Sequence, residues 1–183
     1  GDPAPSPAAT AGKPACPGRA ASTMLRGMNS ATATFAACLR ELADPGQVVE
    51  FSTEVPTAAA AAEQLGCPVG AIANSLVFTV DDEPLLVVAS GAHRVDTRHV
   101  ARVLGVGRIR RASPEFVQEA TGQPVGGGGP GGHPEPIRTV VDRMLADHPV
   151  VWAGAGSKHA MFPTTFDELV RITNGLPMEV VKP

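Results

Sequence analysis

Two apolar stretches separated by three acidic residues constrain the fold of this chain more than any other feature. Residues 71–80 (AIANSLVFTV) and 84–90 (PLLVVAS) are almost entirely apolar, and 81–83 read DDE. Apolar runs of this length joined by a polar turn predict an antiparallel β-hairpin. Because aromatic residues make up only 4% of the chain, we expect the core around this hairpin to be built from Val, Leu, Ile and Ala.

One polar residue interrupts the first of these strands. Side chains alternate between the two faces of a strand, so Asn74 shares a face with Ile72, Leu76 and Phe78. Asparagine is depleted in strands, and a buried amide without a partner costs about 1–3 kcal/mol. The position of Asn74 therefore raises the question of what its side chain meets.

The rest of the chain alternates helical and extended signals. We expect further strands at 47–51, 108–112, 136–141 and 149–154, with a short helical turn between the last two, and helices at 30–42, 58–66, 97–105, 114–122 and 166–175. Caps support the last four helices: Thr57, Asp96 and Ser113 at starts, Gly66, Gly105 and Gly122 at ends, and a capping box of Thr165 with Glu168. Helices mixed with a hairpin predict an α+β or mixed α/β domain.

Composition limits the domain organisation and the classes of function. Residues 1–27 are rich in Pro, Ala and Gly without periodicity, so we expect a flexible tail or an added extension there and a single domain over 28–183. The net charge of -3 does not indicate a globally basic nucleic-acid binder. The sequence contains no run of about 18 apolar residues, so we expect no membrane span. Three cysteines without a CxxC pair favour neither a disulfide framework nor a zinc knuckle, and the reducing cytoplasm is the simplest location.

Two segments rich in small residues each admit two interpretations. Residues 126–133 (GGGGPGGH) contain a formal GxGxxG, but an expected helix precedes it and prolines follow it, which argues against a dinucleotide-binding turn. The segment is then either a surface loop or a backbone-rich wall of a pocket. Residues 153–159 (AGAGSKH) follow a strand and form either an ordinary turn or a set of backbone N–H donors for an anion or a carbonyl oxygen.

Arginine, histidine and cysteine also leave alternatives open. Residues 94–111 hold six of the chain's 15 Lys and Arg residues, and Arg98 and Arg102 share one helix face. These arginines form either a solvated face or a patch that contacts phosphates. The five histidines show no HxxxH or HxH spacing that predicts a metal site. Cys67 is a candidate nucleophile, although a free cysteine is more often a small buried hydrophobe.

The order of these segments resembles a known family. Residues 56–78, 86–105, 112–133, 137–145 and 150–173 together resemble the YbaK/EbsC-type aminoacyl-tRNA deacylases, which are related to the editing domain of bacterial prolyl-tRNA synthetases. The resemblance covers roughly 47–173. It implies an α+β fold with a mixed, barrel-like sheet flanked by helices. It also implies hydrolysis, in trans, of the ester of a mischarged tRNA, without covalent nucleophile, metal or cofactor. The implied partners are that tRNA and, as a second candidate, an aminoacyl-tRNA synthetase.

The resemblance also implies the site residues. The family pattern GGxxPxG is matched by Gly126, Gly127, Pro130 and Gly132, its later aspartate by Asp142, and its small-residue turn by Gly154, Gly156 and Ser157. Where many members carry Lys followed by Thr or Ser, this chain has Asn74 and Ser75.

These matches divide into roles. Asn74, Gly126 and Gly127 are the expected catalytic residues, Arg94, Arg98 and Arg102 the expected tRNA contacts, and the other matched residues, Ser75, Pro130, Gly132, Asp142, Gly154, Gly156 and Ser157, the expected substrate contacts. Asparagine keeps hydrogen-bonding capacity but lacks the charge of lysine. The alternative is therefore a tRNA- or aminoacyl-adenosine-binding module that lost catalysis with Asn74.

Overall fold

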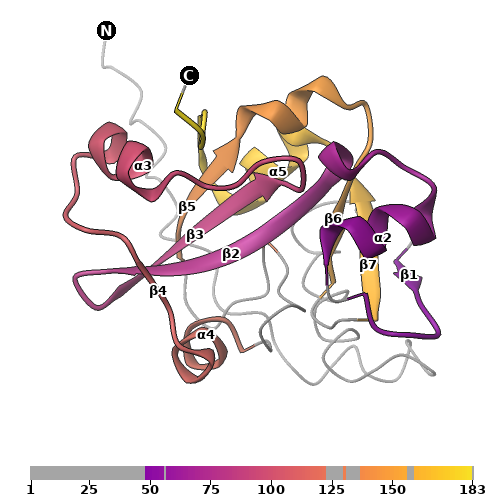
Figure 1. Cartoon of the computed structure of the whole chain (residues 1–183), viewed down its shortest axis with the longest axis horizontal. Coiled ribbons are helices and arrows are strands. Elements are labelled where there is room, and N and C mark those ends of the chain that lie inside the picture. The colour runs from indigo at the N-terminus through magenta and orange to yellow at the C-terminus, as the bar shows by residue number, and fades with distance from the viewer. Residues whose placement is uncertain (1–47, 56, 123–129, 131–136, 156–158, 183) are drawn as a thin grey trace, which may run out of the picture.

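The computed structural model describes residues 48–55, 57–122, 130, 137–155 and 159–182, and these form one mixed sheet with helices on both faces (Figure 1). Its strands are β1 (Val49–Glu50), β2 (Ile72–Val80), β3 (Glu83–Ser90), β4 (Arg110–Arg111), β5 (Arg138–Asp142), β6 (Val151–Gly154), β7 (Ala160–Thr164) and β8 (Leu176–Met178). Its helices are α2 (Ala58–Leu65), α3 (Thr97–Leu104), α4 (Pro114–Thr121) and α5 (Phe166–Thr173), with 3₁₀ turns η1 (Val69–Ala71) and η2 (Arg143–Asp147).

The predicted hairpin is confirmed as the centre of the sheet. β2 and β3 pair antiparallel from Ala73↔Ser90 to Val80↔Glu83. The turn is one residue shorter than expected, because Glu83 already belongs to β3. Asp81 and Asp82 have positive φ values of 51° and 66°. A two-residue turn of this handedness matches the right-handed twist of the strands, which is why the hairpin closes tightly.

The predicted helix limits are confirmed for the four helices of the described residues. The side chains of Thr57, Asp96, Ser113 and Thr165 each accept a hydrogen bond from a backbone N–H in the first turn. Gly66, Gly105 and Gly122 end their helices in the left-handed region, where glycine carries no steric penalty. The helix expected at 30–42 lies outside the described residues.

The sheet is open rather than closed into a barrel. In the order β1-β7-β6-β2-β3-β5-β8, the outer strands β1 and β8 do not pair with each other within the described residues, and β4 joins β2 off this path. β3–β5, β5–β8 and β2–β6 are parallel pairs. The mixed sheet flanked by helices confirms the α+β class.

Strands β7 and β8 were missed because each is short and contains a proline. β1 pairs with Ala160 and Met161 of β7, so on that side no strand of the described residues needs an N–H from Pro163. Proline is tolerated in a sheet at such an unpaired edge.

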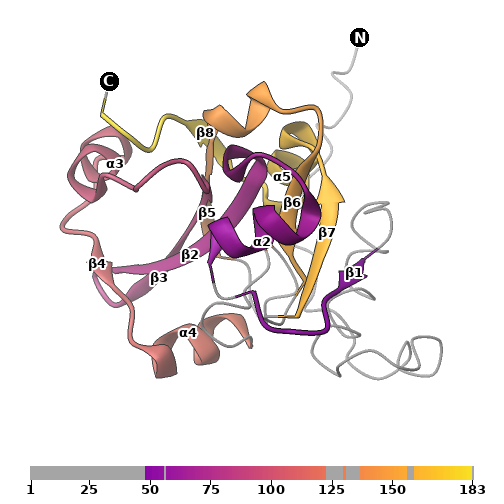
Figure 2. The same ribbon diagram turned by 45° about the vertical axis from the view of Figure 1, so that its right-hand side comes forward.

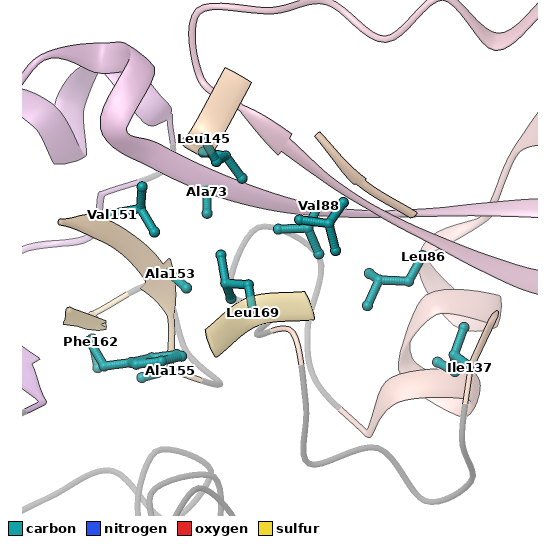
Figure 3. Close-up of a cluster of buried hydrophobic side chains, with 12 residues drawn as sticks. Ala73, Leu86, Val88, Ile137, Leu145, Val151, Ala153, Ala155, Phe162 and Leu169 are labelled. Atoms are coloured by element: carbon teal, nitrogen blue, oxygen red, sulfur yellow. The ribbon is translucent and has the colours of Figure 1, made fainter. Parts of the chain in front are cut away.

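Each face of the sheet has its own buried side chains. On one face Phe162, Leu169 of α5 and Val88 belong to a cluster of buried apolar residues (Figure 3). On the other face α3 packs over Leu85 and Val87, and α2 packs over Ile72. Figure 2 shows α2 in front of the sheet and α5 behind it. No helix of the described ranges is long and apolar enough to cross a bilayer.

The burial of Phe162 predicts a large loss of stability on truncation. Phe162 is fully buried, so Phe162→Ala should lower the free energy of unfolding by about 3–5 kcal/mol in urea titrations. Val103→Ala, at an apolar residue that is 52% exposed on α3, should change it by less than about 0.5 kcal/mol. Equal effects of the two substitutions would contradict this assignment of the core.

Candidate active site

The edge of β2 is unpaired over the residues that include Asn74. β3 pairs with β2 along nearly its whole length, but on the other side β6 pairs only with Ile72 and Ala73, and β4 only with Phe78 and Thr79. Within the described residues, 74–77 therefore have a neighbouring strand on one side only. Alternate residues of an antiparallel strand point their N–H and C=O groups away from the partner. The backbone of this short segment thus offers donors and acceptors to the gap.

A pocket of about 900 Å³ lies at this gap. Asn74 and Leu76 line it from one face of β2, and Ser75 and Val77 from the other. The pocket therefore passes around the unpaired edge of the strand. Its other described walls come from α2, the segment after β3, the region of β4, α4, and the facing ends of β6 and β7. Its volume is within the range of small-molecule sites.

Asn74 and Ser75 give the pocket polar groups without hydrogen-bond partners in the part of the chain that the structure describes. The side chain of Asn74 is half-buried and has no hydrogen bond with a described residue. Ser75 Oγ is buried without a partner among the described residues. A buried hydroxyl without a partner costs about 1–3 kcal/mol, so a bound polar group would stabilise the site. The face expected to be apolar is interrupted here, since Leu76 beside Asn74 is 38% exposed.

The charged side chains that line the pocket are all basic. Arg94 and Arg111 line it, and no aspartate or glutamate does so among the described residues. Neither guanidinium forms an ion pair with another described residue. A cleft lined by one sign of charge concentrates ligands of the opposite sign. The pocket is therefore suited to an anionic ligand.

Arg98 and Arg102 lie outside this pocket. Both are exposed on α3, as the helical spacing predicts. Arg108 and Arg110 are exposed between α3 and the end of β4. The stretch 94–111 therefore contributes two arginines to the pocket and four exposed arginines outside its lining.

Asp142 is buried behind the pocket rather than lining it. Its exposed fraction is 0%, and it accepts three hydrogen bonds. Oδ2 accepts from Ser90 N at 3.0 Å and from His93 Nδ1 at 2.9 Å, and Oδ1 accepts from Met144 N at 3.0 Å. His93 lines the pocket, so Asp142 reaches the site through that imidazole.

The remaining predicted residues are placed unevenly. Gly154 lines the pocket, whereas Pro130 is buried without lining it. Outside the described residues lie Gly126, Gly127, Gly132, Gly156 and Ser157.

Sequence reasoning missed His93 as a lining residue, and it included Arg111 only in the arginine-rich stretch 94–111. His93 follows the expected second strand of the hairpin and belongs to no spacing motif. Its position beside the hairpin that carries Asn74 was the available signal.

The interpretation of Cys67 as a small hydrophobe is favoured. Cys67 does not line the pocket and packs against the cluster of α2 and Ile72. Burial raises the pKa of its thiol, and a protonated thiol is a poor nucleophile. Among the described residues, no group of three His, Cys, Asp or Glu side chains could hold a metal ion.

Comparison with known proteins points to one family. A family model described as an aminoacyl-tRNA editing domain matches residues 52–172. The uncharacterized protein YwhH of Bacillus subtilis (strain 168) is 32% identical over 123 residues, which is 67% of this chain and 78% of YwhH. A proline–tRNA ligase of Levilactobacillus brevis is 27% identical over 146 residues, 79% of this chain but 24% of the ligase. The chain therefore spans only about a quarter of that ligase.

Solved structures agree with the sequence comparisons. A protein described as a candidate trans-editing enzyme for prolyl-tRNA synthetase superposes with a TM-score of 0.78 at 32% identity, covering 85% of this chain and 99% of that one. The hypothetical protein APE2540 superposes with a TM-score of 0.74 at 27% identity, covering 81% and 99%.

The contacts of Asp142 predict that it stabilises the fold. Asp142→Ala would leave buried N–H groups without an acceptor and should lower the free energy of unfolding by more than about 2 kcal/mol. Asp147→Ala is the matched control, because Asp147 is exposed on the same turn. Thermal and urea unfolding measure both, and an equal stability of the two variants would contradict this role.

Proposed function

The chain belongs to the aminoacyl-tRNA editing domain family, and from that premise we propose that it is a deacylase that hydrolyses mischarged tRNA in trans. The observation that carries the proposal is the pocket at the unpaired edge of β2. The amide of Asn74, the buried hydroxyl of Ser75 and the guanidinium groups of Arg94 and Arg111 line this pocket. No carboxylate of the described residues lines it. We further propose that residues 28–183 are a single editing domain and that it acts in the cytoplasm, where its tRNA is found.

The chemistry of the substrate suits these groups. The 3′ end of an aminoacyl-tRNA presents phosphates, ribose hydroxyls and an ester carbonyl close to one another. The ester is already activated, so positioning of a water and stabilisation of the oxyanion can suffice. The ribose hydroxyl beside the ester would assist the attack. This route requires no covalent nucleophile, in keeping with the pKa of Cys67, which burial raises.

In this proposal the residues take distinct roles. Asn74 orients the aminoacyl end, and Ser75 Oγ donates to it. Backbone N–H groups of Gly126, Gly127 and Gly132 and of Gly156 and Ser157 stabilise the oxyanion. Gly154 lines the substrate-binding surface, and Pro130, which does not line the pocket, supports it indirectly. Asp142 acts from behind the pocket wall, through its hydrogen bond with His93.

The arginines are proposed to compensate for the missing lysine charge. Arg94 and Arg111 line the same pocket as Asn74, and guanidinium groups bind phosphate through paired hydrogen bonds. We assign them to the phosphate next to the terminal adenosine. Arg98 and Arg102, on the exposed face of α3, would contact phosphates farther along the acceptor stem.

Editing by a second site has a physical motive that suggests the first substrates to test. A synthetase pocket rejects a slightly smaller amino acid by only about 10–200-fold. Relatives of this chain include proline–tRNA ligases, and alanine and cysteine are small enough to enter a proline site. We therefore propose tRNA with a proline anticodon carrying alanine or cysteine as the first candidate, with prolyl-tRNA synthetase as the candidate partner.

A non-catalytic binding module is the second candidate function. The observation that favours it is Asn74 itself, because an amide cannot polarise a carbonyl as an ammonium does. In that case the pocket would hold tRNA or an aminoacyl-adenosine without turnover.

The deacylase proposal predicts release of the amino acid from a mischarged tRNA. A panel of tRNAs carrying labelled alanine, cysteine or proline is incubated with the protein, and the remaining ester is measured over time. Turnover above the buffer rate is expected for at least one small amino acid, with correctly charged prolyl-tRNA left intact. Bulky side chains at Gly126 or Gly127 should lower this turnover while leaving the unfolding midpoint unchanged.

The absence of turnover across this panel would contradict the enzyme. Asn74→Lys then separates the two candidates. A gain of hydrolysis in this variant indicates a weakened enzyme. Continued binding of tRNA without any hydrolysis in either form indicates the binding module.

The basic pocket lining predicts salt-dependent tRNA binding. Replacing Arg94 and Arg111 by Gln should weaken binding and reduce the slope of log K against log salt by about one for each phosphate that is no longer neutralised. Arg143→Gln is the control, since Arg143 is exposed on η2 outside the pocket. Fluorescence anisotropy of labelled tRNA at several salt concentrations gives the slopes, and a slope equal to that of the control would contradict the assignment.

A further inference from the structure

The geometry points to His93 as the general base of this pocket, with Asp142 as its positioning residue. The inference rests on the proposed deacylase function. It adds a protein group that accepts the proton of the attacking water to the positioning, the oxyanion stabilisation and the ribose-hydroxyl assistance proposed above. It is carried by a pair of side chains that lie 49 residues apart in the chain and meet at the pocket wall.

The hydrogen bond to Asp142 fixes the tautomer of the imidazole. A carboxylate only accepts hydrogen bonds, so the 2.9 Å contact between His93 Nδ1 and Asp142 Oδ2 places a proton on Nδ1. The other ring nitrogen, Nε2, then carries a lone pair in the neutral imidazole. No described residue is bonded to Nε2. His93 therefore has one nitrogen held from behind and one available as a base.

The segment that carries His93 is held by several hydrogen bonds. Ser90 N donates to Asp142 Oδ2, Ser90 Oγ donates to Gly70 O at 2.8 Å, and His93 N donates to Ser90 O at 2.9 Å. The same carboxylate thus fixes both the end of β3 and the imidazole that follows it. A catalytic group held in this way needs little reorganisation during the reaction.

The position of His93 relates it to Asn74 and Ser75. Gly91 N donates to Ile72 O at 2.7 Å, so the segment after β3 begins beside the start of β2, two residues before Asn74. The imidazole is 22% exposed and lines the same pocket as Asn74, Ser75 and Arg94. Because no described carboxylate lines this pocket, His93 has no described anionic competitor for the water's proton.

The proposed step moves one proton twice. His93 Nε2 takes a proton from water as the water oxygen bonds to the ester carbon, and the carbonyl electron pair moves onto oxygen. The tetrahedral intermediate then re-forms the carbonyl and expels the ribose 3′ oxygen, which takes the proton back from Nε2. The net reaction converts ester and water into free amino acid and a 3′ hydroxyl. Imidazole suits this role because it gains and loses a proton near neutral pH.

His93→Asn separates catalysis from structure. The asparagine amide can still donate to Asp142 near the position of Nδ1, but it has no basic nitrogen. With a substrate of the panel, kcat should fall by about 100-fold or more, which is the usual contribution of a general base. KM and the unfolding midpoint should remain those of the wild type. Added imidazole should restore turnover to His93→Gly, whose missing side chain leaves room for it.

His99→Asn is the matched control. His99 is also half-buried with one ring nitrogen hydrogen-bonded, to Glu179 O at 3.1 Å, but it does not line the pocket. This variant should keep the wild-type kcat. Wild-type kcat in His93→Asn, or no rescue of His93→Gly by imidazole, overturns the role of His93 and leaves the deacylase standing. An inactive wild type overturns both.

Discussion

The incomplete pairing of β2 is the constraint on which the rest of the site depends. The strand is central to the sheet, yet only its two ends find described partners opposite β3, in β6 and β4. The hairpin with β3 and the apolar clusters on both faces hold it in place. An interior strand can therefore present free backbone groups and polar side chains without loss of the fold. Such a pocket is set in rigid structure, which favours defined positioning of a ligand.

The site separates functions that one lysine could combine. In the family pattern a lysine in this strand brings charge and hydrogen bonding to a single position, whereas here Asn74 retains only the hydrogen bonding. Arg94 and Arg111 line the same pocket from segments on either side of α3, and we propose that they supply the positive charge instead. The proposed base, His93, depends on Asp142 for its orientation. The resulting pocket is basic, and the carboxylate of Asp142 lies behind its wall.

Features that depend on nearby residues were predictable from the sequence, and features that depend on distant pairing were not. The hairpin and the caps at Thr57, Asp96 and Ser113 follow from local preferences. β7 and β8 escaped because proline and shortness weaken a strand signal that only neighbouring strands restore. The anomaly at Asn74 pointed to the strand that lines the pocket, since polar groups are rarely placed on an apolar strand face without a partner. His93 was missed because its significance comes from Asp142, and only the parallel pairing of β3 with β5 brings these residues together.

We propose that the segment of β2 without a second neighbouring strand receives the aminoacyl end of the substrate. NMR titration with an aminoacyl-adenosine analogue, whose ester is replaced by an amide that is not hydrolysed, tests this binding mode. The backbone amide signals of residues 74–77 and the side-chain signals of Asn74 and His93 should shift together and saturate at one ligand per chain. Saturable shifts confined to other parts of the chain, with these signals unmoved, would contradict it.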